Sequence, residues 1–189
     1  MLNKLLKFSF FISFAYPLFS FAQNAAVKTL KTEYLVNPIG LDNPNPRFTW
    51  QMDDKRIGAK QTAYRILVDT DSLSLVQGKA TQWNTGWLAT SDNLKTYAGQ
   101  LLKPFTKYYW RVDIADQNNA KSTKIKIASF EMGMMNEQNW QGSWISDNQN
   151  IQLKPAPYFR KTFETNKKIK SARAYITAGG LFELSLNGK

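Results

Sequence analysis

Residues 101–116, with the sequence LLKPFTKYYWRVDIAD, constrain the fold more than any other stretch of the chain. Pro104 has no backbone N–H and therefore suits a bend or a strand edge. After it, large apolar side chains occupy every second position: Tyr108, Trp110, Val112 and Ile114. Side chains alternate between the faces of a strand, so one face is apolar, while the other carries Arg111 and Asp113 as an expected surface ion pair. This pattern predicts a central strand of an antiparallel sheet with one face on a core.

Other segments show the same alternation or a strand-forming composition. Strands are expected over residues 30–35, 47–52, 61–69 and 122–132, with short edge strands over 82–87 and 96–99. Their predicted inward side chains are Phe48, Trp50, Met52, Tyr64, Ile66, Val68, Ile125 and Ile127. About seven strands separated by turn signals, without a competing helical periodicity, are typical of an immunoglobulin-like or fibronectin type III β-sandwich. We therefore predict an all-β protein whose first sandwich covers residues 28–134.

The composition changes after residues 133–139, which we interpret as a domain boundary. Further strands are expected over residues 158–163, 169–177 and 181–186, with Gly179 and Gly180 suited to a tight hairpin turn. Three or so strands in roughly 50 residues are too few to close a sandwich. Residues 139–189 are therefore expected to be the truncated start of a second β-sandwich domain.

Residues 1–22 have the features of a secretory signal peptide. Two lysines precede an apolar run at residues 8–21, and Ala22 closes a small-x-small triplet. We predict cleavage between Ala22 and Gln23, and export to the periplasm or the medium. The alternative is a membrane-spanning helix, but the run of about 14 residues is shorter than the roughly 20 required and Pro17 interrupts it. No membrane attachment is expected after cleavage.

Cysteine and histidine are both absent, which removes several classes of site. The chain has no thiol nucleophile, disulfide or thiolate ligand, and it lacks the commonest general base and metal ligand. Its net charge of +11 requires nucleic-acid binding to be considered. The lysines are scattered, however, and no binding motif surrounds the densest group at residues 167–170. We therefore expect a solvated basic surface and no nucleic-acid partner.

Short stretches follow one another along the chain in a characteristic order. They are residues 37–42 (NPIGLD), 46–50 (PRFTW), 61–66 (QTAYRI), 83–86 (WNTG), 97–99 (YAG), 108–112 (YYWRV), 130–133 (FEMG), 140 with 144–145, 156–163 (APYFRKTF), 172–176 (ARAYI) and 186–189 (LNGK). In this order the chain resembles the N-terminal part of bacterial α-L-rhamnosidases, inverting glycoside hydrolases that release terminal rhamnose. The family more often has aspartate and serine before the glycine of residues 83–86, a difference that concerns a turn.

The resemblance implies both an architecture and a mechanism. A fibronectin-like sandwich is followed by a second β-sandwich, an α/α-barrel that carries catalysis, and a C-terminal β-domain. Two barrel carboxylates hydrolyse the substrate by single displacement, without a cofactor. Neither maps onto a residue of this chain, so the resemblance implies an inactive N-terminal fragment of an exported α-L-rhamnosidase. Its partner would be a rhamnose-containing glycan, bound through the missing catalytic domain.

The acidic residues of the chain do not form a convincing catalytic pair. An inverting glycosidase needs two carboxyl groups about 6.5–9.5 Å apart. Asp53 and Asp54 are adjacent and would point apart, and turn chemistry explains Asp69 and Asp71. Asp42 could bind a metal, but a rigid proline turn is the favoured interpretation. We therefore expect no catalytic residue and no metal site in this chain.

Tryptophans near turns and boundaries are the remaining candidates for sugar binding. Trp83, Trp87, Trp140 and Trp144 could each stack on a sugar ring, and Trp140 and Trp144 are kept as substrate-binding candidates. Packing between domains or at the sandwich ends is the favoured interpretation for all four. The rival function is a non-catalytic adhesion or carbohydrate-binding module, because this fold hosts many functions. A long, helix-rich reading frame after Lys189 would favour the enzyme, and a stop codon or β-repeats would favour the module.

Overall fold

The computed structural model describes residues 25–153 and 156–189, and the chain divides into two units, residues 1–142 and 143–189. The predicted signal peptide and its cleavage site between Ala22 and Gln23 lie outside the described residues. Within the described ranges, no helix has both the length and the apolar character needed to cross a bilayer.

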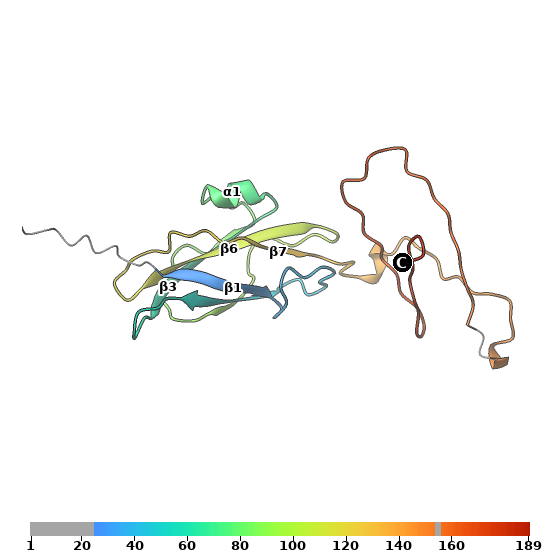
Figure 1. Ribbon diagram of the computed structural model, residues 1–189, viewed down its shortest axis with the longest axis horizontal. Helices are drawn as coiled ribbons and strands as arrows, with labels where there is room; N and C mark the ends of the chain where they lie inside the picture. Colours follow the sequence, from blue (N-terminus) through green and yellow to red (C-terminus); the bar gives the residue numbers. More distant parts are fainter. Residues whose placement is uncertain (1–24, 154–155) are drawn as a thin grey trace, which may run out of the picture. The chain divides into compact units, whose positions relative to one another are not determined.

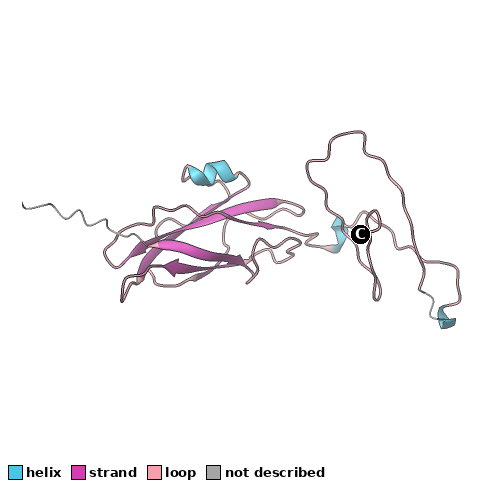
Figure 2. Cartoon of the chain, in the orientation of Figure 1, coloured by secondary structure: helices cyan, strands magenta, loops and turns pink. Residues whose placement is uncertain are grey.

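Two antiparallel sheets form the first unit (Figures 1 and 2). The three-stranded sheet has the order β1–β2–β5, with β1 at Ala26–Thr32, β2 at Arg47–Asp53 and β5 at Leu94–Thr96. The four-stranded sheet has the order β4–β3–β6–β7, with β4 at Trp83–Asn84, β3 at Gln61–Asp69, β6 at Lys107–Asp116 and β7 at Ala128–Glu131. The predicted all-β, immunoglobulin-like sandwich is thereby confirmed.

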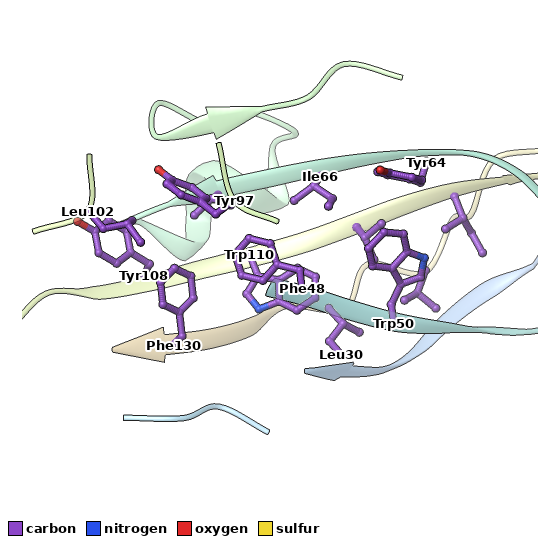
Figure 3. Packing of buried hydrophobic residues seen from close by; sticks show 14 of the residues in the cluster. Leu30, Phe48, Trp50, Tyr64, Ile66, Tyr97, Leu102, Tyr108, Trp110 and Phe130 are labelled. Carbon is purple, nitrogen blue, oxygen red and sulfur yellow. The ribbon is translucent and has the colours of Figure 1, made fainter. Parts of the chain in front are cut away.

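An aromatic core fills the space between the two sheets (Figure 3). Phe48 of β2 stacks on Trp110 of β6 with 4.5 Å between ring centroids, and Trp50 meets Tyr64 edge-on at 4.8 Å. The alternation predicted for β6 is confirmed on this face, since Tyr108, Trp110, Val112 and Ile114 are each at most 3% exposed. Full burial of one large apolar side chain contributes roughly 1.5–3 kcal/mol, so these strands dominate the stability of the unit.

Both faces of β6 are buried, and the prediction of an exposed ion pair on its outer face is wrong. Arg111 and Asp113 are only 6% and 7% exposed. Helix α1 (Ser72–Val76), which the sequence did not reveal, packs on the outer side of β3 and β6 (Figure 1). Asp71 caps this helix by accepting the N–H groups of Leu73 and Ser74. A helix of five residues is too short to show a helical periodicity in the sequence.

The first and last strands differ from their predicted limits. β1 begins at Ala26 rather than at residue 30, and a positive φ of 53° at Thr29 interrupts its alternation, so the pattern was hard to recognise. β7 covers only Ala128–Glu131, although a strand was expected from residue 122. Ile125 is 48% exposed instead of facing the core. The expected strand does not extend back to residue 122, because pairing with the end of β6 stops at Lys121 and Ser122 and resumes only at Ala128.

The described residues of the second unit contain no strand, so the three strands expected after residue 157 are not formed. Its regular structure is a 3-10 turn, η2, at Ile151–Leu153, and a tight turn in which Leu186 and Lys189 exchange backbone hydrogen bonds. Side chains from residue 156 to 189 are all exposed. Strand-forming residues need a neighbouring strand to pair their N–H and C=O groups, and these segments have no such partner among the described residues.

Candidate functional site

The proline-rich loop after β1 is bound along β7, at the end of the sandwich where the chain leaves the first unit (Figure 1). The side-chain Oδ1 of Asn37 accepts the Ser129 N–H at 2.8 Å, and the N–H of Leu41 donates to the Glu131 carbonyl at 3.0 Å. Oδ1 of Asp42 accepts the Met135 N–H at 2.7 Å. The loop therefore acts as a bracket that holds residues 129–135 in place. Asp42 has a structural role in it.

Gly133 lies where the bracket leaves little space for a side chain. Its N–H donates to the Leu41 carbonyl at 2.7 Å, and its own carbonyl accepts the Phe105 N–H at 3.0 Å. A Cβ atom at this position would lie 2.6 Å from Oδ1 of Asp42 and 3.1 Å from the Gly40 carbonyl oxygen. The proline-rich loop and the loop before β6 thus both bind the backbone of Gly133, where there is little space for a side chain.

Large apolar side chains are exposed around the same bracket. Of the twelve large hydrophobic residues exposed within residues 25–142, six lie on the loops that close this end of the sandwich. We call these six residues the exit surface: Tyr34, Leu35, Val36, Ile39, Leu101 and Phe105. Arg47 stacks on Tyr34 at 4.8 Å and pairs with Glu33 at 2.6 Å, so a charged pair borders the surface.

At the opposite end of β6, an arginine joins two buried carboxylates. Arg56 pairs with Asp54 and, at 2.6 Å, with Asp116, whose side chain is fully buried. Oδ1 of Asp116 also accepts the N–H groups of Asn118 and Ala120, each at 2.9 Å. The Arg56 guanidinium lowers the pKa of Asp116 and holds the pKa of Asp54 at about 2. Both groups are ionised structural acceptors that tie the loop after β2 to the turn after β6.

A second charged network covers the outer face of β3 and β6. Asp113 Oδ2 accepts from Arg65 at 2.7 Å and from Arg111 at 2.8 Å. Arg111 also donates to the Leu75 carbonyl of α1 at 2.6 Å. Trp87 lies beyond Arg65, with the guanidinium carbon 5.6 Å and the Lys121 ammonium 4.9 Å from its ring centroid. These side chains and α1 cover the outer face of the sheet, which explains why Asp113 is buried.

The other acidic residues singled out from the sequence also support the backbone. Oδ2 of Asp69 accepts the N–H of Thr81 at 2.6 Å, and Asp71 caps α1. Burial of Asp69 acts to raise its pKa, but the hydrogen bonds that its carboxylate accepts outweigh this and lower the pKa. Hydrogen bonds also lower the pKa of Asp71, and Arg47 lowers the pKa of Glu33. A general acid of an inverting glycosidase requires a raised pKa, which is the opposite shift. Within the described residues, no cluster of three or more acidic, histidine or cysteine side chains could hold a metal ion.

The four tryptophans lie in different environments. Trp83 packs against Phe48 and Tyr97, with ring centroids 6.3 and 5.1 Å away, so it belongs to the edge of the core. Trp87 belongs to the outer-face network. Trp140 is 39% exposed at the end of the first unit, and Trp144 is 78% exposed in the second unit. Sugar binding by Trp140 and Trp144 stays a prediction.

The sandwich, its aromatic core and the bracketed exit define an immunoglobulin-like β-domain that passes directly into further chain. Residues 27–136 match the family model described as the Rha78A-like, N-terminal immunoglobulin domain. The chain belongs to this family.

Curated proteins similar to this chain include several α-L-rhamnosidases. The chain is 31% identical over 176 residues to an α-L-rhamnosidase of Formosa agariphila, and 31% identical over 182 residues to one of Alteromonas sp. strain LOR. These matches cover 81% and 90% of the chain, but only 18% and 20% of the relatives. A solved α-L-rhamnosidase from Dictyoglumus thermophilum superposes with a TM-score of 0.63 at 32% identity, over 65% of the chain and 14% of that structure. The chain thus spans about a fifth of the length of its curated relatives.

Proposed function

We propose that the chain is the N-terminal, non-catalytic part of an exported α-L-rhamnosidase. The whole enzyme would hydrolyse terminal α-L-rhamnose from glycosides or polysaccharides by an inverting mechanism with two carboxylates and no cofactor. The observation that carries this proposal is the family match over residues 27–136, combined with relatives of which the chain spans only about a fifth. In this scheme the chemistry belongs to the part of the enzyme that the sequence does not include.

The geometry of the first unit supports a scaffold role. The carboxylates of Asp54, Asp113 and Asp116 each accept hydrogen bonds from arginine, and those of Asp42 and Asp69 accept backbone N–H groups. These carboxylates are occupied as acceptors that hold loops and arginine side chains in place. The hydrogen bonds around Gly133 likewise hold the proline-rich loop and the loop before β6 to the segment after β7.

The test compares the full-length gene product with the chain that ends at Lys189. We expect the full-length protein to release the dye from a chromogenic α-L-rhamnoside, and the short chain to release none under the same conditions. A correctly folded full-length protein that releases no dye would contradict the proposal that it is an α-L-rhamnosidase. Binding of rhamnosides without turnover would instead favour the carbohydrate-binding module, with Trp140 and Trp144 as the first residues to replace by alanine.

Export is tested separately. The full-length protein should be recovered from the periplasm or the medium with Gln23 as its first residue, by N-terminal sequencing or mass spectrometry. A cytoplasmic product that keeps residues 1–22 would contradict both the cleavage site and the predicted export.

A further inference from the structure

We propose that Trp87, Arg65 and Lys121 form a binding site for an acidic sugar unit, one that carries a carboxylate or a sulfate group. The three side chains lie together on the outer side of β3 and β6. This inference rests on the proposed function and deepens it, because the ligand is a charged unit of the glycan on which the whole enzyme would act.

The first argument is that the backbone around each of these side chains is fixed to the sheet. Arg65 belongs to β3 itself. Next to Trp87, the backbones of Leu88 and Tyr64 exchange two hydrogen bonds of 2.8 and 3.0 Å, so the loop after β4 is held on β3. Lys121 pairs with the end of β6 in a short antiparallel bridge. A site built from ordered groups loses less conformational entropy when a ligand binds.

The second argument is an excess of positive charge around the Trp87 ring. The Arg65 guanidinium carbon lies 5.6 Å and the Lys121 ammonium 4.9 Å from the ring centroid. Asp113 balances only part of this charge, because its Oδ2 is shared between Arg65 and Arg111. Among the residues that the structure describes, Lys121 has no acidic partner. Three cations therefore share one carboxylate, and an anionic ligand would be attracted to them.

The third argument is that the groups needed for binding are accessible. Trp87 is partly exposed, Lys121 is exposed, and the Arg65 side chain keeps 25% of its surface exposed. Arg65 donates to Asp113 through Nε and Nη2, so that its Nη1 has no hydrogen-bond partner within residues 25–153 and 156–189. The C–H groups of a sugar ring pack on an aromatic ring, and a carboxylate or sulfate accepts hydrogen bonds from guanidinium and ammonium groups.

An acidic glycan fits these observations better than a nucleic acid. Nucleic-acid binding uses a series of phosphate contacts, whereas the lysines of this sequence are scattered. The similar curated proteins are named α-L-rhamnosidases, so glycans are the polymers expected at this protein. The net charge of +11 would draw a polyanionic glycan toward the protein. The proposed substrate class is thereby narrowed to polysaccharides in which rhamnose and acidic sugars occur together.

The experiment measures binding of the full-length enzyme to polymers that contain no rhamnose. Calorimetric titrations at low salt use polygalacturonate as the carboxylated probe, dextran sulfate as the sulfated probe, and dextran as the neutral control. Lys121→Gln removes one cation of the site, and Lys103→Gln removes the same charge from an exposed position before the start of β6. We expect Lys121→Gln to raise the Kd for an acidic polymer by about ten-fold, and Lys103→Gln by less than about two-fold.

Trp87→Ala tests the aromatic part of the site. We expect it to raise the same Kd by about five-fold, because the sugar loses its packing surface. A thermal melt of each variant reports whether it is folded. Lys121→Gln alters only an exposed side chain, and it carries the test if Trp87→Ala does not fold.

The possible results separate the proposal from its alternatives. Binding that depends on Lys121 supports it, and the acidic polymer that binds more tightly identifies the anionic group. Equal weakening by Lys121→Gln and Lys103→Gln would overturn the proposal in favour of a general basic surface. Binding of dextran as tight as that of the acidic polymers, or no binding of either acidic polymer, would also overturn it. Single-stranded DNA bound as tightly, with the same loss in Lys121→Gln, would assign the site to polyanions in general.

Turnover of the chromogenic α-L-rhamnoside, which contains no acidic sugar, is recorded on the same wild-type sample. Missing turnover together with binding that depends on Lys121 would contradict the rhamnosidase assignment alone. Turnover without such binding would contradict the acidic-sugar site alone.

Discussion

At the scale of single residues, Trp110 shows how much one side chain contributes to this sandwich. It is completely buried and stacks on Phe48 across the two sheets (Figure 3). Trp110→Ala removes these contacts and leaves a cavity, so we expect a loss of about 3–5 kcal/mol in the free energy of unfolding of the first unit. Leu101→Ala, at an 82% exposed position, is the control and should change it by less than about 0.5 kcal/mol. A loss below about 1 kcal/mol for Trp110→Ala, in denaturant unfolding followed by near-UV circular dichroism, would contradict the packing.

Asp116 makes the stability of the unit dependent on pH. Its pKa is lowered by Arg56, so the folded state favours the ionised carboxylate. A carboxylate with a lowered folded pKa contributes stability that is complete above the unfolded pKa of about 4 and is lost as the pH falls through the folded value. We therefore expect a stable plateau near neutral pH and a steep decline below about pH 4.

Asp116→Asn tests this assignment. The variant should be less stable at pH 7 and should lose less stability than the wild type between pH 5 and pH 2.5, in thermal melts at matched ionic strength. Glu137→Gln, on an exposed 3-10 turn, controls for the removal of one negative charge. If the melting temperatures of the wild type and Asp116→Asn fall in parallel as the pH is lowered, other groups cause the acid sensitivity.

At the scale of structural elements, β6 is held from both sides, and Asp113 is central to the outer side. It pairs with two arginines, one of which also donates a hydrogen bond to α1. Removing one partner of a buried ion pair leaves uncompensated charge, so we expect Asp113→Ala to cost about 3–5 kcal/mol. Lys28→Ala, which removes the exposed pair with Asp53, is the control and should cost about 1 kcal/mol or less. Equal small losses in urea unfolding would restore the interpretation of Asp113 as a surface residue.

The bracket at the exit depends on one position, and two glycines allow a matched test. Gly133→Ala places a Cβ atom 2.6 Å from Asp42, so we expect a loss of about 1–3 kcal/mol from overpacking and a weakened hold on Met135. Gly142→Ala meets no atom within 4 Å and should be nearly neutral. Thermal unfolding gives the stability, and amide hydrogen exchange at Met135 reports the bracket directly. Unchanged exchange in Gly133→Ala would show that Asp42 does not depend on this glycine.

The sequence predicted the strands in which apolar and polar residues alternate because one face of the strand is buried. β2, β3 and β6 were recognised from side chains such as Phe48, Tyr64 and Trp110, because one face of each strand lies on the core. Helix α1 was missed, since it is short and fixed by a cap and by tertiary packing. The strands expected after residue 157 illustrate the opposite error. Their composition favours extended structure, but a strand also requires a paired neighbour, which a local pattern does not reveal.

The bracket itself could have been only partly foreseen. The NPIGLD stretch was recognised as a rigid loop, and the glycine of FEMG was visible at the domain boundary. Their contact joins Asp42 to Met135 across 93 residues of sequence, and neither segment alone contains that information. The same limit applies to Arg56 and Asp116, which are 60 residues apart. Sequence reasoning identified the types of residue, whereas the fold decides which of them meet.

At the scale of the whole molecule, the proposed enzyme makes a stereochemical prediction. Single displacement by an activated water inverts the anomeric carbon, so the first product of hydrolysis should be β-L-rhamnose. Proton NMR during the first minutes with the full-length enzyme should show the β anomer before mutarotation produces the α anomer. Early release of the α anomer would indicate a covalent intermediate, and it would contradict the inverting mechanism while leaving the rhamnosidase activity intact. The chain ending at Lys189, mixed with the same substrate, is the control and should produce neither anomer.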